Sequence, residues 1–515
     1  MPGDLAKLKE GARTVLSLVD HPLWMVATLL PILVVRAISA AVPGHYDADC
    51  WWVAAAGREI LRTGAVPTVN GFSFVDGTQP WIMHEWLMGP LFAWGIAKLG
   101  PPFLALLALV VGAVTMTVAL SSIVRESRSV LSAWVSAALL VGCFSDRFVT
   151  ARPTGLALVF PVLLLAVALR PSFGLREVLL SVAVMLAWTN AHGSFPLGLL
   201  ILLAGALGAF SPVDRRARAV ALGLGALATL CNPYGLRLHR FVFHYLAGDE
   251  PVFALVHRRI AEFSPLFGAG AHDWAGAQLL AGIAGLAVLT ISGLLDRQAR
   301  VRALVSVPLL VLGARNARHV ELAGLLSVML LAPATNALAS RLERAVEVPQ
   351  GKERLATGTN TFVPRWLRWL AAAAGVVGLV LWCARAMTRP SDDALLGRLR
   401  PAAILTSALP AGAHVLAPFD TSGLVTWLAF PRGVLTFADS RNDCFRASTL
   451  ETFFDLETAP LGATDLARVL DGAGVTSALL PDPHPQAAAM AHLPGWHPAG
   501  REGDWTLFAR GEPRD

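Results

Sequence analysis

The chain has 515 residues, of which 55% are hydrophobic and only 15% are charged, and its formal net charge is +6. Because soluble proteins of this size carry about a quarter charged residues, the composition excludes an ordinary soluble enzyme. Basic residues in short loops between apolar segments explain the net charge without a nucleic-acid partner, and the five cysteines form neither a metal-binding spacing nor a disulfide framework.

Apolar segments recur from the N-terminus to about residue 388, each close to the length that crosses a bilayer. They are continuously apolar, which indicates helices and not barrel strands. We therefore predict an all-α polytopic membrane domain over residues 1–388. Its eleven predicted transmembrane helices are at 22–42, 101–124, 129–145, 154–170, 176–191, 194–211, 216–231, 276–295, 300–314, 319–340 and 367–388.

Basic clusters in alternate connections predict the orientation of these helices. The sequences RESR at 125–128, VDRRARA at 213–219 and DRQARVR at 296–302 all fall on one side of the membrane. Short loops rich in Lys and Arg stay in the cytoplasm. The N-terminus is therefore expected to be cytoplasmic, and eleven spans place the C-terminus outside.

The first outer loop in this topology is residues 43–100. From Asp49 to Thr63 its pattern predicts an amphipathic helix with Trp51 and Trp52 on the apolar face. Tryptophan favours the headgroup zone of a bilayer, so we expect this helix to lie along the outer membrane surface.

Four ionisable residues in this loop are candidates for chemistry. Asp47 and Asp49 stand at its start, and His84 and Glu85 stand near the start of a second predicted interfacial helix at 81–100. They could supply a general base, or carboxylates of Asp47, Asp49 and Glu85 could hold a divalent cation such as Mg²⁺ or Mn²⁺. Alternatively, Asp49 is only the N-cap of its helix, which would leave Asp47 as the acid without a structural role.

The other outer connections contain arginines that the positive-inside rule does not explain. An anionic ligand would account for them together, whereas snorkelling at helix ends is the alternative for each one alone. The arginines are Arg147, Arg152, Arg258, Arg259, Arg315 and Arg318. In addition, Asn190 and His192 lie at the outer end of another span and could hydrogen-bond sugar or phosphate.

Residues 389–515 have the composition of a soluble domain. HVLAPFD, GVLTFADS, TSALLPD and WTLFARG read as short strands, and ATDLARVLDGAG reads as a helix among them. This alternation predicts a small extracytoplasmic α/β domain. The sequence TFADSRNDCF follows a predicted strand, where it could form a ligand loop or a charged surface turn with an internal ion pair.

Motifs along most of the chain resemble a group of bacterial membrane proteins in the GT-C superfamily of glycosyltransferases, which includes oligosaccharyltransferases, protein O-mannosyltransferases and lipid A aminoarabinose transferases. The similar segments are DADCWWVAAAGREILRTGAVPTVNGFSFVDGTQPWIMHEWL, ARPTG, WTNAHGSFPLG, NPYG, RNARH and TFADSRNDCF. The group's pattern has a histidine where this chain has Val53. The resemblance implies a GT-C-like fold in the bacterial cytoplasmic membrane.

The resemblance also implies a donor sugar on a polyprenyl phosphate or diphosphate, with Asp47 or Asp49 as catalytic base or acceptor-placing residue. Arginine suits the departing phosphate because its planar fork of donors matches phosphate oxygens. We therefore expect a glycosyltransferase that acts on a glycan, lipid or protein acceptor at the outer membrane face.

Two other functions remain open from the sequence. A transporter or flippase for an anionic lipid-linked substrate would need charged or helix-breaking residues near mid-membrane and paired broken helices. In this chain the polar residues gather at outer helix ends, which favours the enzyme. A non-catalytic envelope assembly protein is the third alternative.

Overall fold

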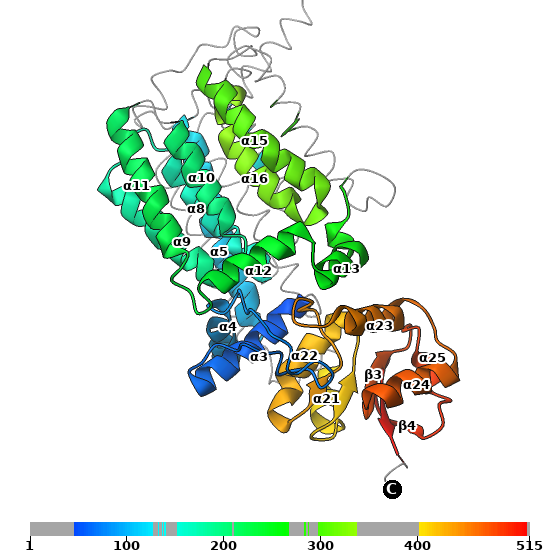
Figure 1. Cartoon of the computed structure of the whole chain (residues 1–515). Coiled ribbons are helices and arrows are strands. Elements are labelled where there is room, and N and C mark those ends of the chain that lie inside the picture. Colours follow the sequence, from blue (N-terminus) through cyan, green and yellow to red (C-terminus); the bar gives the residue numbers. More distant parts are fainter. Residues whose placement is uncertain are drawn as a thin grey trace, which may run out of the picture.

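The computed structural model describes residues 46–126, 152–208, 211–266, 297–336 and 401–511, together with a few single positions between these ranges. The predicted spans at 22–42 and 367–388, most of those at 129–145 and 276–295, and Arg147 lie outside the described residues. The described elements form a helical bundle and, at one end of it, a smaller part with a β-sheet (Figure 1).

The bundle helices fall where the sequence predicts membrane spans, with ends shifted by a few residues. Among the described residues, α5 is the one helix that is both long and apolar enough to cross a membrane by itself. The count of eleven transmembrane helices stays a prediction. The bundle consists of α5 (Pro102–Glu126), α7 (Pro153–Ala157), α8 (Val159–Ala168), α9 (Leu175–Ala191), α10 (Pro196–Leu207), α11 (Pro212–Ala228), α15 (Arg297–Arg315) and α16 (Val320–Leu330).

Large apolar side chains cover the outside of this bundle. Leu179 on α9 is 60% exposed, Leu200 on α10 is 61% exposed and Leu227 on α11 is 60% exposed. An apolar surface shared by three neighbouring helices marks contact with another apolar phase. A lipid bilayer is the environment that this surface fits.

Short helices cover the end of the bundle that faces the C-terminal part (Figure 1). They come from the connection between α11 and α15 and from the turn between α15 and α16. The elements are α12 (Leu236–Ala247), α13 (Pro251–Arg259), η2 (Ala261–Phe263) and η4 (Ala317–His319). Polar side chains from two separate connections therefore meet at this end.

The first outer loop supplies α3 (Ala48–Thr63) and α4 (Met88–Leu99). The N-cap of α3 is Asp47, whose side chain accepts a hydrogen bond from the backbone N–H of Asp49 over 3.0 Å. The interpretation of Asp49 as the cap is therefore wrong. The second helix begins at Met88 and not at residue 81, so His84 and Glu85 lie in the turns before it.

The tryptophans of α3 lie in the protein interior, so the prediction that they face lipid headgroups is wrong. Trp51 is 3% exposed and Trp52 is 5% exposed. The helix packs against α4 on one side and α22 (Phe419–Ala429) on the other (Figure 1). An amphipathic pattern shows that a helix has an apolar face, but it does not show whether that face meets lipid or protein.

The C-terminal part contains the small sheet that the sequence predicts, with strand order β2-β1-β3-β5-β4. Strand β1 is parallel to β2 and β3, whereas β5 is antiparallel to β3 and β4. The strands are β1 (His414–Leu416), β2 (Leu435–Thr436), β3 (Ser477–Pro481), β4 (Trp496–Glu502) and β5 (Trp505–Arg510). Besides α22, the helices are α21 (Ala402–Ser407), α23 (Ala447–Thr458), α24 (Ala463–Ala473) and α25 (Ala487–Met490).

The first outer loop pairs with the open edge of this sheet at β2. The N–H of Phe74 donates to the carbonyl of Thr436 over 3.2 Å, and the N–H of Thr436 donates to the carbonyl of Phe72 over 2.9 Å. The side chain of Asp76 binds Arg446 at 2.6 Å. Backbone pairing and an ion pair therefore dock the loop on the C-terminal part. The exact domain boundary at residues 388–389 stays a prediction.

We expect Gly423→Val to destabilise the packing of α22 on α3. A Cβ atom at position 423 would lie 2.5 Å from the carbonyl oxygen of Ala48, and overpacking of this kind costs about 1–3 kcal/mol. Thermal unfolding in detergent should show a lower Tm. Gly472→Ala on α24 is the control, because a Cβ atom there meets open space and alanine favours helix. Equal Tm values for both variants would contradict the described packing.

Candidate active site

Three carboxylates converge on the guanidinium of Arg152, which directly precedes Pro153 at the start of α7. Its Nε lies 3.6 Å from Asp47 Oδ2 and 3.5 Å from Asp49 Oδ2. Glu262 in η2 accepts from both terminal nitrogens, with 3.1 Å from Nη2 to Oε2. We call these four residues the acid cluster. They bring together the first outer loop, the start of α7 and the segment after α13.

The acid cluster is open enough for a ligand to reach it. The side chains of Asp47 and Asp49 are 22% and 20% exposed. Burial and, after it, the neighbouring charge of Asp49 raise the pKa of Asp47 to about 7, although the Arg152 charge opposes both effects. A carboxyl group with this pKa can accept a proton near neutral pH.

Arg152 is already paired with carboxylates. Burial alone would lower its pKa, but Asp49, Asp47 and Glu262 outweigh that effect and raise it. The Arg152 guanidinium already faces the carboxylates of Asp47, Asp49 and Glu262. Arg152 therefore balances the acids, and a phosphate must find its positive charge elsewhere.

Asp49 has a fixed orientation because two donors meet one of its oxygens. The indole Nε1 of Trp52 donates to Oδ1 over 3.0 Å, and the hydroxyl of Ser440 donates to the same atom over 2.9 Å. Its other oxygen faces Arg152. Ser440 belongs to the C-terminal part, so residues from both parts of the molecule meet at this carboxylate.

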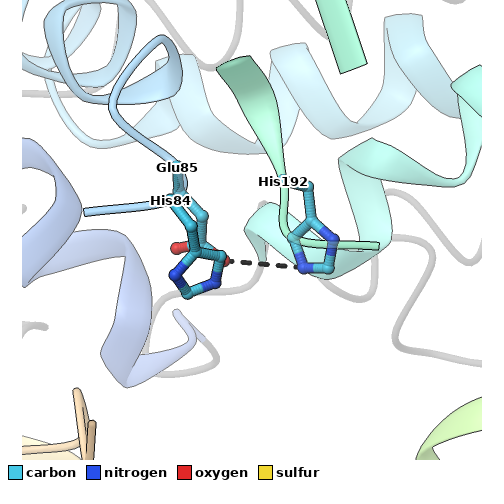
Figure 2. A group of neighbouring side chains, drawn as sticks. All are labelled: His84, Glu85 and His192. Carbon is cyan, nitrogen blue, oxygen red and sulfur yellow. Dashed lines mark ion pairs between the residues drawn. The ribbon is translucent and has the colours of Figure 1, made fainter. Parts of the chain in front are cut away.

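A second group consists of His84, Glu85 and His192 (Figure 2), and the charge of Arg152 in the acid cluster acts on His192. Glu85 Oε1 lies 3.5 Å from His84 Nε2 and 3.6 Å from His192 Nε2. Glu85 is 5% exposed, and its other oxygen, Oε2, has no hydrogen-bond partner among the residues that the structure describes. A hydrogen bond of 2.8 Å between His192 Nδ1 and the Ser194 hydroxyl orients the His192 ring.

The C-terminal part reaches this second group through Asp443, whose Oδ2 lies 3.9 Å from His84 Nδ1. Burial raises the pKa of Asp443 to about 7 although His84 and Arg441 oppose the shift. Burial would lower the pKa of His84, but Glu85 and Asp443 reverse that effect and raise it. For His192, burial and then the charges of His84 and Arg318 hold the pKa well below its usual range, so its imidazole is neutral.

Arg318 lies in η4 and differs from Arg152 in its partners. Its Nη1 donates to the Tyr245 hydroxyl over 3.1 Å, and its guanidinium stacks over the Phe263 ring at 4.6 Å. Within the described part of the chain, no carboxylate pairs with it. This guanidinium is therefore a positive group with donors available to an anion.

The other residues that the sequence predicted for the site, Asn190, Arg258, Arg259 and Arg315, belong to neither of these two groups. Asn190 donates to the carbonyls of Leu186 and Cys231 and accepts from the Trp86 indole over 2.9 Å, so it fixes the segment that contains His84 and Glu85. Arg259 pairs with Asp455 at 2.6 Å, which joins α13 to α23. Arg258 and Arg315 are exposed at the ends of their helices.

Sequence reasoning did not point to Glu262 or Tyr245, and it marked Ser440 and Asp443 only as part of the possible ligand loop TFADSRNDCF. The turn TFADSRNDCF does contain an internal ion pair, between Asp439 and Arg441 at 2.7 Å, but both side chains are fully buried. The interpretation as a surface turn is therefore wrong. The position of TFADSRNDCF after a predicted strand was the one sequence signal that pointed to a ligand loop.

No protein-family model and no curated protein matches the sequence. Among solved structures, the chain is similar to the archaeal oligosaccharyltransferase AglB from Archaeoglobus fulgidus in complex with an inhibitory peptide and a dolichol-phosphate. That match has a TM-score of 0.55 and 12% identity, and it covers 89% of this chain and 69% of AglB.

The chain is also similar to ArnT from Cupriavidus metallidurans bound to undecaprenyl phosphate. Here the TM-score is 0.52 and the identity 15%, and the match covers 95% of this chain and 99% of ArnT. Both structures are polytopic GT-C membrane proteins. The chain therefore has the GT-C fold.

Proposed function

We propose that this protein is a membrane glycosyltransferase that moves a sugar from a polyprenyl-phosphate-linked donor to a glycan, lipid or protein acceptor. The observation that carries this proposal is the acid cluster at the end of an apolar bundle, with Arg318 nearby. The GT-C neighbours support it, since one is bound to undecaprenyl phosphate and another is in complex with a dolichol-phosphate and a peptide.

Asp47 acts as the general base in this proposal. It accepts the proton of the acceptor hydroxyl while that oxygen attacks the anomeric carbon of the donor and the bond to the phosphate breaks. Its pKa of about 7 lets it do so near neutral pH. Asp49 stays beside it in a fixed orientation, and Arg152 limits the repulsion between the two acids.

Arg318 binds the departing phosphate. Its charge is not neutralised by a described carboxylate, and the Phe263 ring and the Tyr245 hydroxyl hold the guanidinium in place. A preorganised positive group that meets charge developing on a leaving group accelerates transfer. The polyprenyl chain would lie in the bilayer along the apolar bundle.

His84, Glu85 and His192 hold a divalent cation in this proposal. Donor atoms around a tetrahedral zinc ion lie about 3.3 Å apart, close to the 3.5 and 3.6 Å that separate Glu85 Oε1 from the two imidazoles. The buried Oε2 of Glu85 has no hydrogen-bond partner in the described part of the chain, which supports a positive neighbour here. Two imidazoles favour zinc over magnesium. Asp47 and Asp49 lie with Arg152 and are not part of this group.

The proposed site faces the outside of a bacterial cytoplasmic membrane. The N-terminus is cytoplasmic and the C-terminal domain extracytoplasmic, as the distribution of Lys and Arg among the loops predicts.

We expect Asp47→Asn to reduce sugar transfer by about 10²- to 10⁴-fold, because it removes the base. Asparagine caps a helix as well as aspartate does, so α3 should remain intact. In the wild type, kcat/KM should rise with pH through about 7 and then level, since the base must be deprotonated. Asp465→Asn on exposed α24 is the control and should transfer normally. Full activity of Asp47→Asn would contradict the assignment.

Arg318→Gln should weaken binding of undecaprenyl phosphate by about tenfold or more, because a hydrogen-bonded charge pair is lost. The measurement is a titration of the purified protein in nanodiscs by native mass spectrometry. Arg468→Gln, at an exposed position of α24, should bind like the wild type. Equal affinity of the Arg318 variant and the wild type would exclude Arg318 as the phosphate ligand.

Metal analysis of the purified protein should find about one zinc ion per chain. Both Glu85→Gln and His192→Ala should lose it, because each removes one ligand. His497→Gln in β4 lies outside the group and should retain the ion. The same metal content in the wild type and both ligand variants would contradict the proposed cation site.

A further inference from the structure

An ion pair and hydrogen bonds hold the turn from Asp439 to Cys444. It follows β2 and runs to the start of α23. At its centre the guanidinium of Arg441 pairs with Asp439, and both side chains are fully buried. Burying an ion pair is expensive unless its geometry and hydrogen bonds are good, so such a pair specifies one conformation of the turn.

The first outer loop supplies three of the side chains that contact Arg441. The Arg441 guanidinium lies 4.6 Å from the Trp81 ring and 5.0 Å from the Phe72 ring, and it donates to the side-chain oxygen of Asn70. The amide nitrogen of Asn70 donates to the Cys444 carbonyl over 3.1 Å. The turn is therefore fixed against the outer loop as well as within its own domain.

Backbone conformation adds a second constraint. Asn442 has a φ of 59°, the one positive φ at a non-glycine position among the described residues, and its Nδ2 donates to the Ser440 carbonyl over 2.8 Å. Strained backbone of this kind persists where the surrounding structure enforces it, often at functional sites. Here the enforced geometry directs the Ser440 hydroxyl at Asp49 Oδ1 over 2.9 Å.

We propose that the C-terminal domain completes the active site, and that Ser440 is the positioning residue through which it acts. The Ser440 hydroxyl and the Trp52 indole hold Oδ1 of Asp49 from two sides, which leaves Oδ2 facing Arg152. These contacts fix the Asp49 carboxylate beside Asp47 and keep the two carboxylates at a constant relative position. The inference rests on the proposed function, because it assigns a role within that reaction.

Both parts of the molecule determine how Asp47, Asp49 and Ser440 lie, because α3 contacts both. Asp47 and Asp49 lie in or beside the first turn of α3, and that helix packs on α22 of the C-terminal domain. Ser440 and the acids are thus carried by two parts of the molecule that pack against each other. The C-terminal domain therefore helps to set the geometry of the acids, in addition to any contact with the acceptor.

The test compares Ser440→Ala and Ser440→Thr in the full chain, reconstituted in nanodiscs with a polyprenyl-phosphate-linked sugar. Loss of a hydrogen bond to a charged group predicts a fall in kcat of about 10- to 100-fold for the alanine variant. Its KM for the donor and its Tm should stay near the wild-type values. The threonine variant keeps the hydroxyl and should retain most of the rate. Ser448→Ala, at an exposed position of α23, is the matched control.

Two results would overturn this role for Ser440. One is a wild-type kcat in the alanine variant, and the other is a threonine variant that is as slow as the alanine variant. Failure of the proposed function is a distinct outcome, because the wild type itself would then transfer no sugar from the donor.

Discussion

The ion pairs between Arg152 and the carboxylates of Asp47, Asp49 and Glu262 are the interaction on which the rest of the site depends. Three partly buried acids repel one another, and a single guanidinium at the start of α7 offsets that repulsion. Burial and the charge of Asp49 raise the pKa of Asp47 to about 7 against the opposing charge of Arg152, and a carboxyl group with this pKa can exchange a proton at neutral pH.

Arg152 and Arg318 have different roles in the proposed site because their partners differ. Arg152 stabilises the acids, whereas Arg318 rests on an aromatic ring and a hydroxyl and has no described carboxylate partner. A cation that is already neutralised gains little from a phosphate, but one held by neutral groups gains much more. The proposed division of roles between base and phosphate site follows from this difference in partners.

The sequence predicted the parts of the site that are local in the chain. The spans, the strands and the acids of DADCWW follow from hydrophobic patterns and from adjacent residues. It did not predict the pairing of Glu262 with Arg152 or of Ser440 with Asp49, because each pair is brought together by the packing of distant segments. The same limit explains the error about Trp51 and Trp52. Their apolar face was evident, but its partner, α22, is more than 360 residues away in the sequence.

The central claim is that Arg318 binds the phosphate of a lipid-linked donor at the same end of the bundle as the acid cluster, which supplies the base. A cryo-EM structure of the full chain in nanodiscs with undecaprenyl phosphate tests it most directly. The account predicts phosphate density within hydrogen-bond distance of the Arg318 guanidinium and on the same side of the bundle as Asp47. Phosphate density at the opposite end of the bundle, near the pair of Arg302 and Glu126, would contradict it.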